Sequence, residues 1–322
     1  FRVSLAHGSV RDAALRIAWG FRSLYNVPEV MSLLRGSLGQ DDEVYWRRAA
    51  MEGLHGNLQA VLDEFAHLLP EWLGLAGGNP DQIARQIGAA IHDAVAIRAV
   101  NYSLDDVQVD DDQITLSTLH MRVRFALRFG RDMTDNQQVL QRSTAVRAAF
   151  NSPFWPFVLA STSVGQEGLD FHQYCHAVVH WNLPANPVDL EQREGRVHRY
   201  KGHAIRKNVA ERHRAAAFER RDRDPWAAMF AEAVRGSRGR ELRDIEPYWV
   251  YEGAAHIERH IPMLPLSREV EQRARLQRSL AAYRLVFGQA RQEDLVAYLQ
   301  DHVSPEALVD LAQRLRINLT PK

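Results

Sequence analysis

Apolar residues recur every three or four positions over most of the first hundred residues, as they do on the buried face of an α-helix. In the first such stretch they are Ala13, Ile17, Phe21 and Leu24. Ser9 and Asp12 precede them with the spacing of a capping box, which predicts a helix start. The same texture continues from residue 28 to about residue 97. We therefore expect a helical region over residues 1–96.

A polar residue followed by proline marks three further helix starts. They are Asn79-Pro80, Asn186-Pro187 and Ser304-Pro305. Asparagine and serine side chains cap the free backbone amides of a first turn, and proline suits the first helical position because it has no amide to leave unsatisfied. We expect helices to begin at these three places.

After residue 97 the pattern changes to short runs of β-branched and aromatic residues, which predict strands. Two such runs, 114–119 and 121–129, lie near an acidic turn at 110–112. Next along the chain we expect a helix near 137–150 and short apolar strands at 157–160 and 177–181. Strands that alternate with helices in this way predict an α/β fold with a parallel sheet.

Three regions follow from this pattern. We expect a helical region or insertion over 1–96, an α/β domain over 97–206 and a helical C-terminal extension over 207–322. Within the extension, one apolar stripe at helical spacing is expected to pack against the α/β domain. It consists of Leu276, Leu280, Tyr283 and Phe287.

The composition is that of a globular protein, with 46% hydrophobic and 25% charged residues among 322. Forty basic residues balance forty acidic ones, so a nucleic-acid surface would have to come from local clustering. Between Glu191 and Arg243 there are fifteen basic and eight acidic residues. This excess suits a phosphate backbone, or else forms a solvated helical face.

No apolar run is long enough to cross a membrane, and no charged-then-apolar leader opens the sequence, so we expect a soluble protein without a membrane partner. The single cysteine, Cys175, cannot form an internal disulfide, which favours the cytoplasm. The three lysines follow Tyr200, Arg206 and Pro321, so the Gly-Lys pair of a phosphate-binding P-loop does not occur. The sequence also begins at Phe1, and we expect it to be a piece of a longer protein or a processed product.

The first candidate site follows the predicted strand at 157–160. It contains Ser161, Thr162, Gly168 and Asp170. Ligands of open α/β sheets bind beyond the carboxyl ends of the strands, and hydroxyls and glycines placed there suit phosphate or sugar recognition. A tight structural turn would use the same residue types.

The second candidate site lies on the helix expected to start at Asn186. It contains Gln192, Gly195, Arg196 and Arg199. On one continuous helix these residues share a face, where two guanidinium groups flank a glycine that leaves room for a ligand. Such a pair suits bidentate binding of phosphate oxygens. A solvated basic face paired with Glu191 and Glu194 is the structural alternative.

Together the two motifs resemble the fifth and sixth motifs of superfamily 2 helicases, nearest the Swi/Snf-type DNA translocases. The fifth corresponds to 161–170, the sixth to 192–199, and the segments 181–184 and 186–189 resemble the family's link between them. The resemblance spans about residues 120–205. The whole chain is also similar to the C-terminal halves of large bacterial helicase-like proteins, some of them associated with antiviral defence.

The resemblance implies a second RecA-like domain, with a parallel sheet flanked by helices, that completes an ATP site formed mainly by another domain. Arg199 would be the arginine finger on the γ-phosphate, and Arg196 would bind phosphate or bridge the domains. Gly168 and Asp170 would face the nucleotide, as would Gln192 and Gly195 of the second motif. Ser161 and Thr162 would contact the phosphates of the tracked strand.

The resemblance further implies an ATP-dependent helicase or translocase, with double-stranded DNA as its track. The N-terminal RecA-like domain of the same polypeptide would be its partner and would supply the P-loop and most Mg²⁺ ligands, so residues 1–322 alone would be inactive. Proteins of a defence system would be further partners. The alternative is a non-catalytic helicase-like module that binds nucleic acid or protein without turnover.

Two other groups of residues resemble metal sites. Asp63, Glu64 and His67 approach an Asp-Glu-x-His motif, but the histidine lies four residues after the aspartate instead of three, and an ordinary helix is expected. His172, Cys175, His176 and His180 offer zinc ligands. Strand alternation would send neighbouring members to opposite faces, so we expect core or turn side chains and no metal site.

Overall fold

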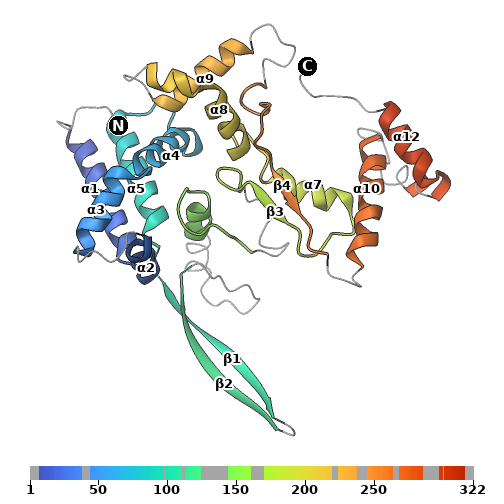
Figure 1. The fold of residues 1–322 in the computed structure, drawn as a ribbon, viewed down its shortest axis with the longest axis horizontal. Helices are drawn as coiled ribbons and strands as arrows, with labels where there is room; N and C mark the ends of the chain where they lie inside the picture. Colours follow the sequence, from blue (N-terminus) through green and yellow to red (C-terminus); the bar gives the residue numbers. More distant parts are fainter. Residues whose placement is uncertain are drawn as a thin grey trace. The chain divides into compact units, whose positions relative to one another are not determined.

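We describe the protein from a computed structural model (Figure 1). The structure describes residues 7–37, 44–97, 99–110, 113–124, 144–160, 170–219, 224–237, 245–263, 268–285, 297–299 and 301–315. The chain divides into two compact units. Unit 1 comprises Phe1–Gly165 and Ala217–Ala228, and unit 2 comprises Gln166–Ala216 and Met229–Lys322.

The first part of unit 1 is helical, as the sequence pattern predicts. Its helices are α1 (Gly8–Tyr25), α2 (Pro28–Ser37), α3 (Tyr45–His55), α4 (Leu58–Trp72) and α5 (Pro80–Val95). Helices α1 and α5 pack closely, because Gly88 of α5 lies against Ala13 of α1. A Cβ atom at Gly88 would lie 2.9 Å from the Ala13 Cα atom, so this crossing requires glycine.

A second stretch of unit 1 packs on these helices. Residues 144–150 are helical, within the helix predicted near 137–150. The ring of Phe154 meets Phe21 of α1 and Phe65 of α4 edge to face, at centroid distances of 5.3 and 6.2 Å. Phe65 is only 1% exposed, so these rings belong to the core of unit 1.

The strand predicted at 157–160 is not formed, and this prediction was wrong. Phe157 and Val158 are 71% and 84% exposed, and no strand among the described residues pairs with this segment. The preceding residue, Pro156, lacks a backbone donor, which also disfavours a central strand. An apolar run therefore does not make a strand without a neighbour to receive its backbone hydrogen bonds.

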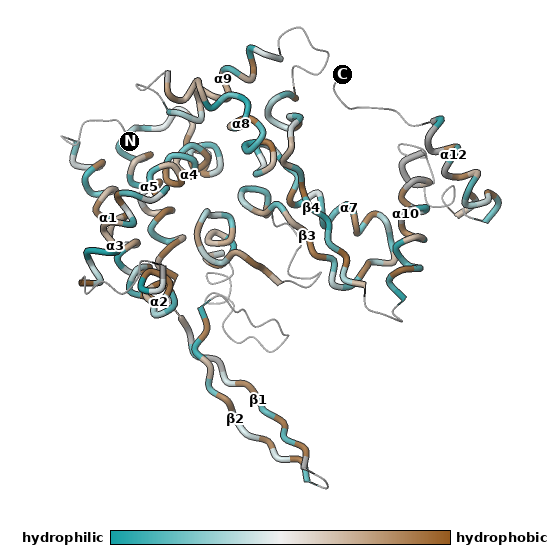
Figure 2. Tube along the Cα trace, in the orientation of Figure 1, coloured by the Kyte–Doolittle hydropathy of each residue, from teal (hydrophilic) through white to brown (hydrophobic). Residues whose placement is uncertain are grey.

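Strands β1 (Val100–Asp110) and β2 (Gln113–Val123) form an antiparallel ribbon (Figure 1). In its register Leu104 lies opposite Leu119 and Val107 lies opposite Leu116. Apolar and polar positions alternate along both strands (Figure 2), yet all four of these side chains are at least half exposed. Strand β2 contains the run predicted at 114–119 and the start of the run predicted at 121–129, so these two runs form one strand instead of two, and residues 125–129 lie outside the described residues. Strand β1 was not among the predicted runs, and the hairpin belongs to a different sheet from the parallel pair of unit 2.

Unit 2 combines a small parallel sheet with helices. Strand β3 (Ala177–Val179) pairs in parallel with β4 (Glu258–His260). Helices α7 (Pro187–Gly195) and α10 (Glu269–Leu285) pack on each other, and α12 (Pro305–Leu315) packs on α10. Helices α8 (His203–Glu219) and α9 (Pro225–Gly236) each contribute residues to both units. The fold is therefore of mixed helix and sheet, and it contains a parallel strand pair.

All three predicted polar–proline helix starts are confirmed. Asn79 accepts a hydrogen bond from the Asp81 amide at 2.9 Å, and Asn186 accepts one from the Val188 amide at 2.8 Å. Ser304 accepts one from the Ala307 amide at 3.2 Å. The capping box predicted at Ser9 was wrong, since α1 starts after His7 and the Ser9 hydroxyl donates to the Asp81 carboxylate instead. Among the described residues, no helix has the length and apolar character needed to cross a membrane.

Candidate functional site

Helix α7 is tied to both strands of the parallel pair through one carboxylate, that of Glu194. Its Oε1 atom lies 3.1 Å from Nε2 of His180, the residue directly after β3. Arg259 of β4 makes two bonds to the same carboxylate, with Nη2 donating to Oε2 at 2.6 Å. His180 is 2% exposed, so this network joins α7, β3 and β4 at the edge of a buried region.

The surroundings of Glu194 favour its ionised form. Burial by itself would raise the pKa of this carboxyl, but hydrogen bonds from His180 and Arg259 outweigh burial. The net effect lowers the pKa of Glu194 to about 2. The sequence predicts Glu194 only as an ion-pair partner of nearby arginines on the same helix. The structure pairs it with Arg259, which lies 65 residues away and gives no local signal.

Helix α7 ends at Gly195, so the prediction that Arg196 and Arg199 lie within one continuous helix was wrong. Arg196 is the C-cap residue, and residues 196–200 form turn, bend and irregular structure instead of helix. The backbone explains the end of the helix, because the Arg196 carbonyl accepts a hydrogen bond from the Phe171 amide at 2.9 Å. This bond attaches the residue after Asp170 to the end of α7. The two predicted motifs therefore meet through their backbones.

The side chains of the two motifs meet as well. Arg199 Nε lies 3.0 Å from Asp170 Oδ1, and each side chain is a little under half exposed. The same Nε atom is 3.3 Å from the Gly195 carbonyl oxygen. Both contacts use Nε, so the two terminal nitrogens of Arg199 have no bonding partner among the described residues. A surface-accessible guanidinium with two available donors can bind a phosphate or carboxylate.

Lys201 anchors the chain just after Arg199. It has a positive φ of 48° and is only 5% exposed. Its ammonium nitrogen lies 5.0 Å from the ring centroid of Phe230, and Tyr200 and Tyr248 are within 5.6 Å. Its amide donates to the Tyr248 carbonyl at 2.7 Å. These contacts hold the backbone beside Arg199 in one conformation, which sequence reasoning did not detect.

Arg206 forms a second anchor, and it is 1% exposed. Its guanidinium donates to the carbonyl oxygens of Lys201 and Gln173 and lies 5.0 Å from the ring centroid of Tyr174. It therefore links the segment after Asp170 to the segment after Arg199. Burial, with Arg206 as the next cause, lowers the pKa of nearby His203 to about 4, so this histidine is neutral at pH 7.

The other predicted site residues make fewer contacts that bear on a function. Gln192 is exposed on α7, and in the described part of the chain no hydrogen bond joins it to Arg199. The space beside Gly195 is open, since apart from its two neighbours and the backbone of its own helix no described atom lies within 4 Å of the position that a Cβ atom would take. Arg196 is partly buried. Ser161, Thr162 and Gly168 lie outside the described residues.

The residues that resembled metal sites are used in other ways. His67 lies on α4, and its Nδ1 is 2.6 Å from Asp224, which caps α9 through the Trp226 and Ala227 amides. His176 stacks on His203 at 5.1 Å. In the part of the chain that is described, no three His, Cys, Asp or Glu side chains are grouped to hold a metal ion.

The part of the chain that is similar to known proteins includes the region where the two motifs meet. Residues 119–201 match the helicase conserved C-terminal domain family. A stretch of 42 residues is 48% identical to the uncharacterized ATP-dependent helicase YqhH of Bacillus subtilis (strain 168). That stretch is 13% of this chain and 7% of the relative, so the chain spans a small part of that protein. No solved structure gives a significant match.

The family match includes Asp170, helix α7 and Arg199, and it ends at Lys201. Residues 119–201 are thus similar to a helicase C-terminal domain, and both candidate motif ends lie within that region. Arg206, β4 and α10 lie outside the match, although they contact residues within it.

Proposed function

We propose that this chain is the C-terminal part, with the second RecA-like domain, of an ATP-dependent nucleic-acid helicase or translocase. The observation that carries the proposal is the contact between Arg199 and Asp170. It joins the last residue of the first motif to the last arginine of the second, within the region that matches a helicase C-terminal domain. The β3–β4 pair, which is parallel, supports the RecA-like sheet.

Arg199 is proposed as the arginine finger. Its terminal nitrogens are available as donors, its Nε holds Asp170, and Lys201 fixes the adjoining backbone. These residues fit a nucleotide phosphate, because a fixed and accessible guanidinium can neutralise charge on transferring phosphoryl oxygens. Removing such a finger lowers turnover by about 10³–10⁵ in well-studied phosphoryl-transfer systems. Arg196, which caps α7, would bind phosphate or bridge to the other domain.

The nucleotide is proposed to be ATP with Mg²⁺, which supplies the phosphoryl group whose transfer drives movement along the strand. The sequence contains no Gly-Lys pair, so the P-loop and most Mg²⁺ ligands would come from an N-terminal RecA-like domain of the same polypeptide. From this chain, Asp170, Gln192 and Gly195 would face the nucleotide together with Gly168. Ser161 and Thr162 would contact the nucleic-acid backbone.

Double-stranded DNA is the proposed track, on the resemblance of the two motifs to Swi/Snf-type translocases. The lone Cys175 supports a cytoplasmic location, since a reducing compartment leaves such a thiol free. A role in antiviral defence, with protein partners of such a system, remains a prediction from the resemblance of the whole chain.

The site is tested by ATP turnover of the Arg199→Ala variant in the intact polypeptide that contains residues 1–322. Arg235→Ala is the matched control, because Arg235 is 52% exposed and paired with Glu232, much as Arg199 is 46% exposed and paired with Asp170. We expect R199A to lose at least about 10³ of the turnover rate while R235A keeps it. Equal turnover of both variants would remove Arg199 from the site.

A further inference from the structure

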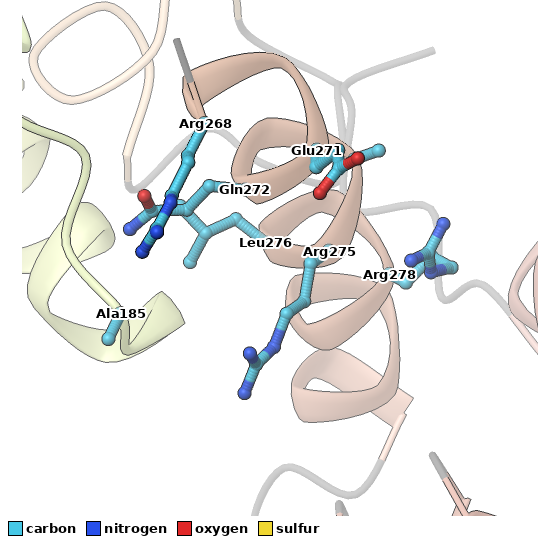
Figure 3. Close-up of a pocket in the computed structure, with 8 residues that line it drawn as sticks. Ala185, Arg268, Glu271, Gln272, Arg275, Leu276 and Arg278 are labelled. Carbon is cyan, nitrogen blue, oxygen red and sulfur yellow. The ribbon is translucent and has the colours of Figure 1, made fainter.

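An open cavity of about 660 Å³ lies along helix α10, outside the region that matches the helicase domain. Three arginines line it, namely Arg268, Arg275 and Arg278. Arg268, Gln272 and Arg275 are spaced by four and seven residues and therefore share one face of the helix. Figure 3 shows these three side chains extending toward the side where Ala185 lies.

The positive charge of these arginines is not balanced by carboxylates close to them. Among the described residues that line the cavity, Glu271 is the one carboxylate, and Figure 3 shows Glu271 on the other side of the helix from Arg268. Within the described part of the chain, no carboxylate lies within ion-pair distance of Arg268, Arg275 or Arg278. Guanidinium groups in such surroundings attract anions, and phosphate oxygens match their planar donors.

The spacing of the arginines favours a polymer over a small anion. Arg268 and Arg275 are seven residues apart, which corresponds to about 10 Å of rise along a helix. Phosphates along one strand of DNA recur about every 3.4 Å of the duplex axis, so a strand offers several anions over that distance. A strand therefore matches this spacing better than a single phosphate does.

Helix α10, which lines the cavity, packs against the elements of the candidate site. Leu276 of α10 is 3% exposed and clusters with Leu183 and with Leu190 of α7. The amide group of Gln272 donates to the Leu183 carbonyl at 2.9 Å and to the Pro184 carbonyl at 3.3 Å. Leu183 and Pro184 belong to the segment that links the two motifs. A strand held at α10 would therefore keep a fixed relation to α7.

We propose that Arg268 and Arg275 bind backbone phosphates of nucleic acid. This would be a contact in addition to the one expected at Ser161 and Thr162, and it rests on the proposed function only in taking nucleic acid as the partner. Contacts to backbone phosphates carry no sequence information, so binding at Arg268 and Arg275 would not depend on the base sequence. This contact would increase the affinity for nucleic acid and hold the strand during ATP hydrolysis.

The test is the salt dependence of binding, measured by fluorescence anisotropy with a fluorescein-labelled 30-base-pair DNA duplex. The test variant is R268Q/R275Q, and the matched control is R273Q/R314Q. Arg273 and Arg314 are exposed arginines on α10 and α12 that do not line this cavity, so both variants lose two charges. Thermal melting followed by circular dichroism checks that both remain folded.

We expect the test variant to bind about tenfold more weakly and to lose about 2 from the slope of log affinity against log salt. R268K/R275K keeps both charges and should restore most of that slope. The control should keep a slope closer to that of the unchanged protein, because exposed charges away from the strand act only at long range.

Three results would overturn the inference. The test variant could bind with the slope of the unchanged protein, or the control could lose as much slope as the test variant. Alternatively, 1 mM pyrophosphate could abolish the arginine-dependent part of binding, which would indicate a small phosphate ligand. If the unchanged protein bound no nucleic acid, the proposed function would fail too, whereas normal binding by the test variant would remove this site alone.

Discussion

Replacing Glu194 by glutamine is the perturbation that best tests how α7 is held. The substitution keeps the size of the side chain but removes the charge that Arg259 and His180 share. Arg259 would keep partial contact with water, as 42% of its side chain is exposed, whereas the side chain of His180 is 1% exposed and would lose its carboxylate hydrogen-bond partner. We expect the fold of unit 2 to be weakened.

The magnitude follows from the pKa of Glu194, which is lowered from 4.5 to about 2. A difference of that size corresponds to about 3 kcal/mol. Screening by solvent at the exposed guanidinium reduces this to about 1–2 kcal/mol. Because the folded-state pKa lies below the unfolded value, the ionised carboxylate stabilises the fold above pH 4.5, and this contribution is lost as the pH falls through about 2.

Urea unfolding at pH 7 and at pH 3.5 measures this effect. The E194Q variant should be about 1–2 kcal/mol less stable than the unchanged protein at pH 7, and the difference should shrink at pH 3.5. Glu232→Gln is the control, because its partner Arg235 is exposed and such a pair contributes about 0–1 kcal/mol. A pH-independent difference, or equal losses in the two variants, would refute the reasoning.

Two further predictions concern glycine packing and thiol reactivity. Gly88→Ala should destabilise the protein in thermal unfolding despite a gain of about 1 kcal/mol in helix propensity, because the new Cβ would lie 2.9 Å from Ala13. The control Gly53→Ala should stabilise the protein, because its Cβ would meet only Leu58, at 3.7 Å. The opposite order would contradict the close packing of α1 on α5. Cys175 should react with iodoacetamide at pH 8 more slowly in the folded protein than in urea, because burial raises the pKa of its thiol. A hydrogen bond with the Ala177 backbone has a smaller, opposing effect on that pKa. Equal reaction rates would show that the thiol is not shielded.

Local signals in the sequence predicted helix starts well. Asn79, Asn186 and Ser304 each cap a helix as expected, because the cap and the amide it binds are two or three residues apart. Ser9 has the same type of signal, but its hydroxyl binds Asp81, 72 residues away. A capping pattern therefore fails when a distant partner competes for the same side chain.

The candidate site could be predicted in composition but not in geometry. Its motifs identified Asp170 and Arg199, which lie together in the structure. The end of α7 at Gly195 could not be predicted, because it depends on the Arg196 carbonyl meeting Phe171, which precedes it by 25 residues and is brought near only by folding. The same holds for Glu194, whose partner Arg259 lies on a different element.

We propose that this chain completes the ATP site of a nucleic-acid translocase. The most direct test is ATP hydrolysis by the intact polypeptide that contains residues 1–322, measured with and without duplex DNA. We expect Mg²⁺-dependent hydrolysis that duplex DNA stimulates. Binding of DNA without any hydrolysis would contradict it and would identify the chain as a non-catalytic helicase-like module.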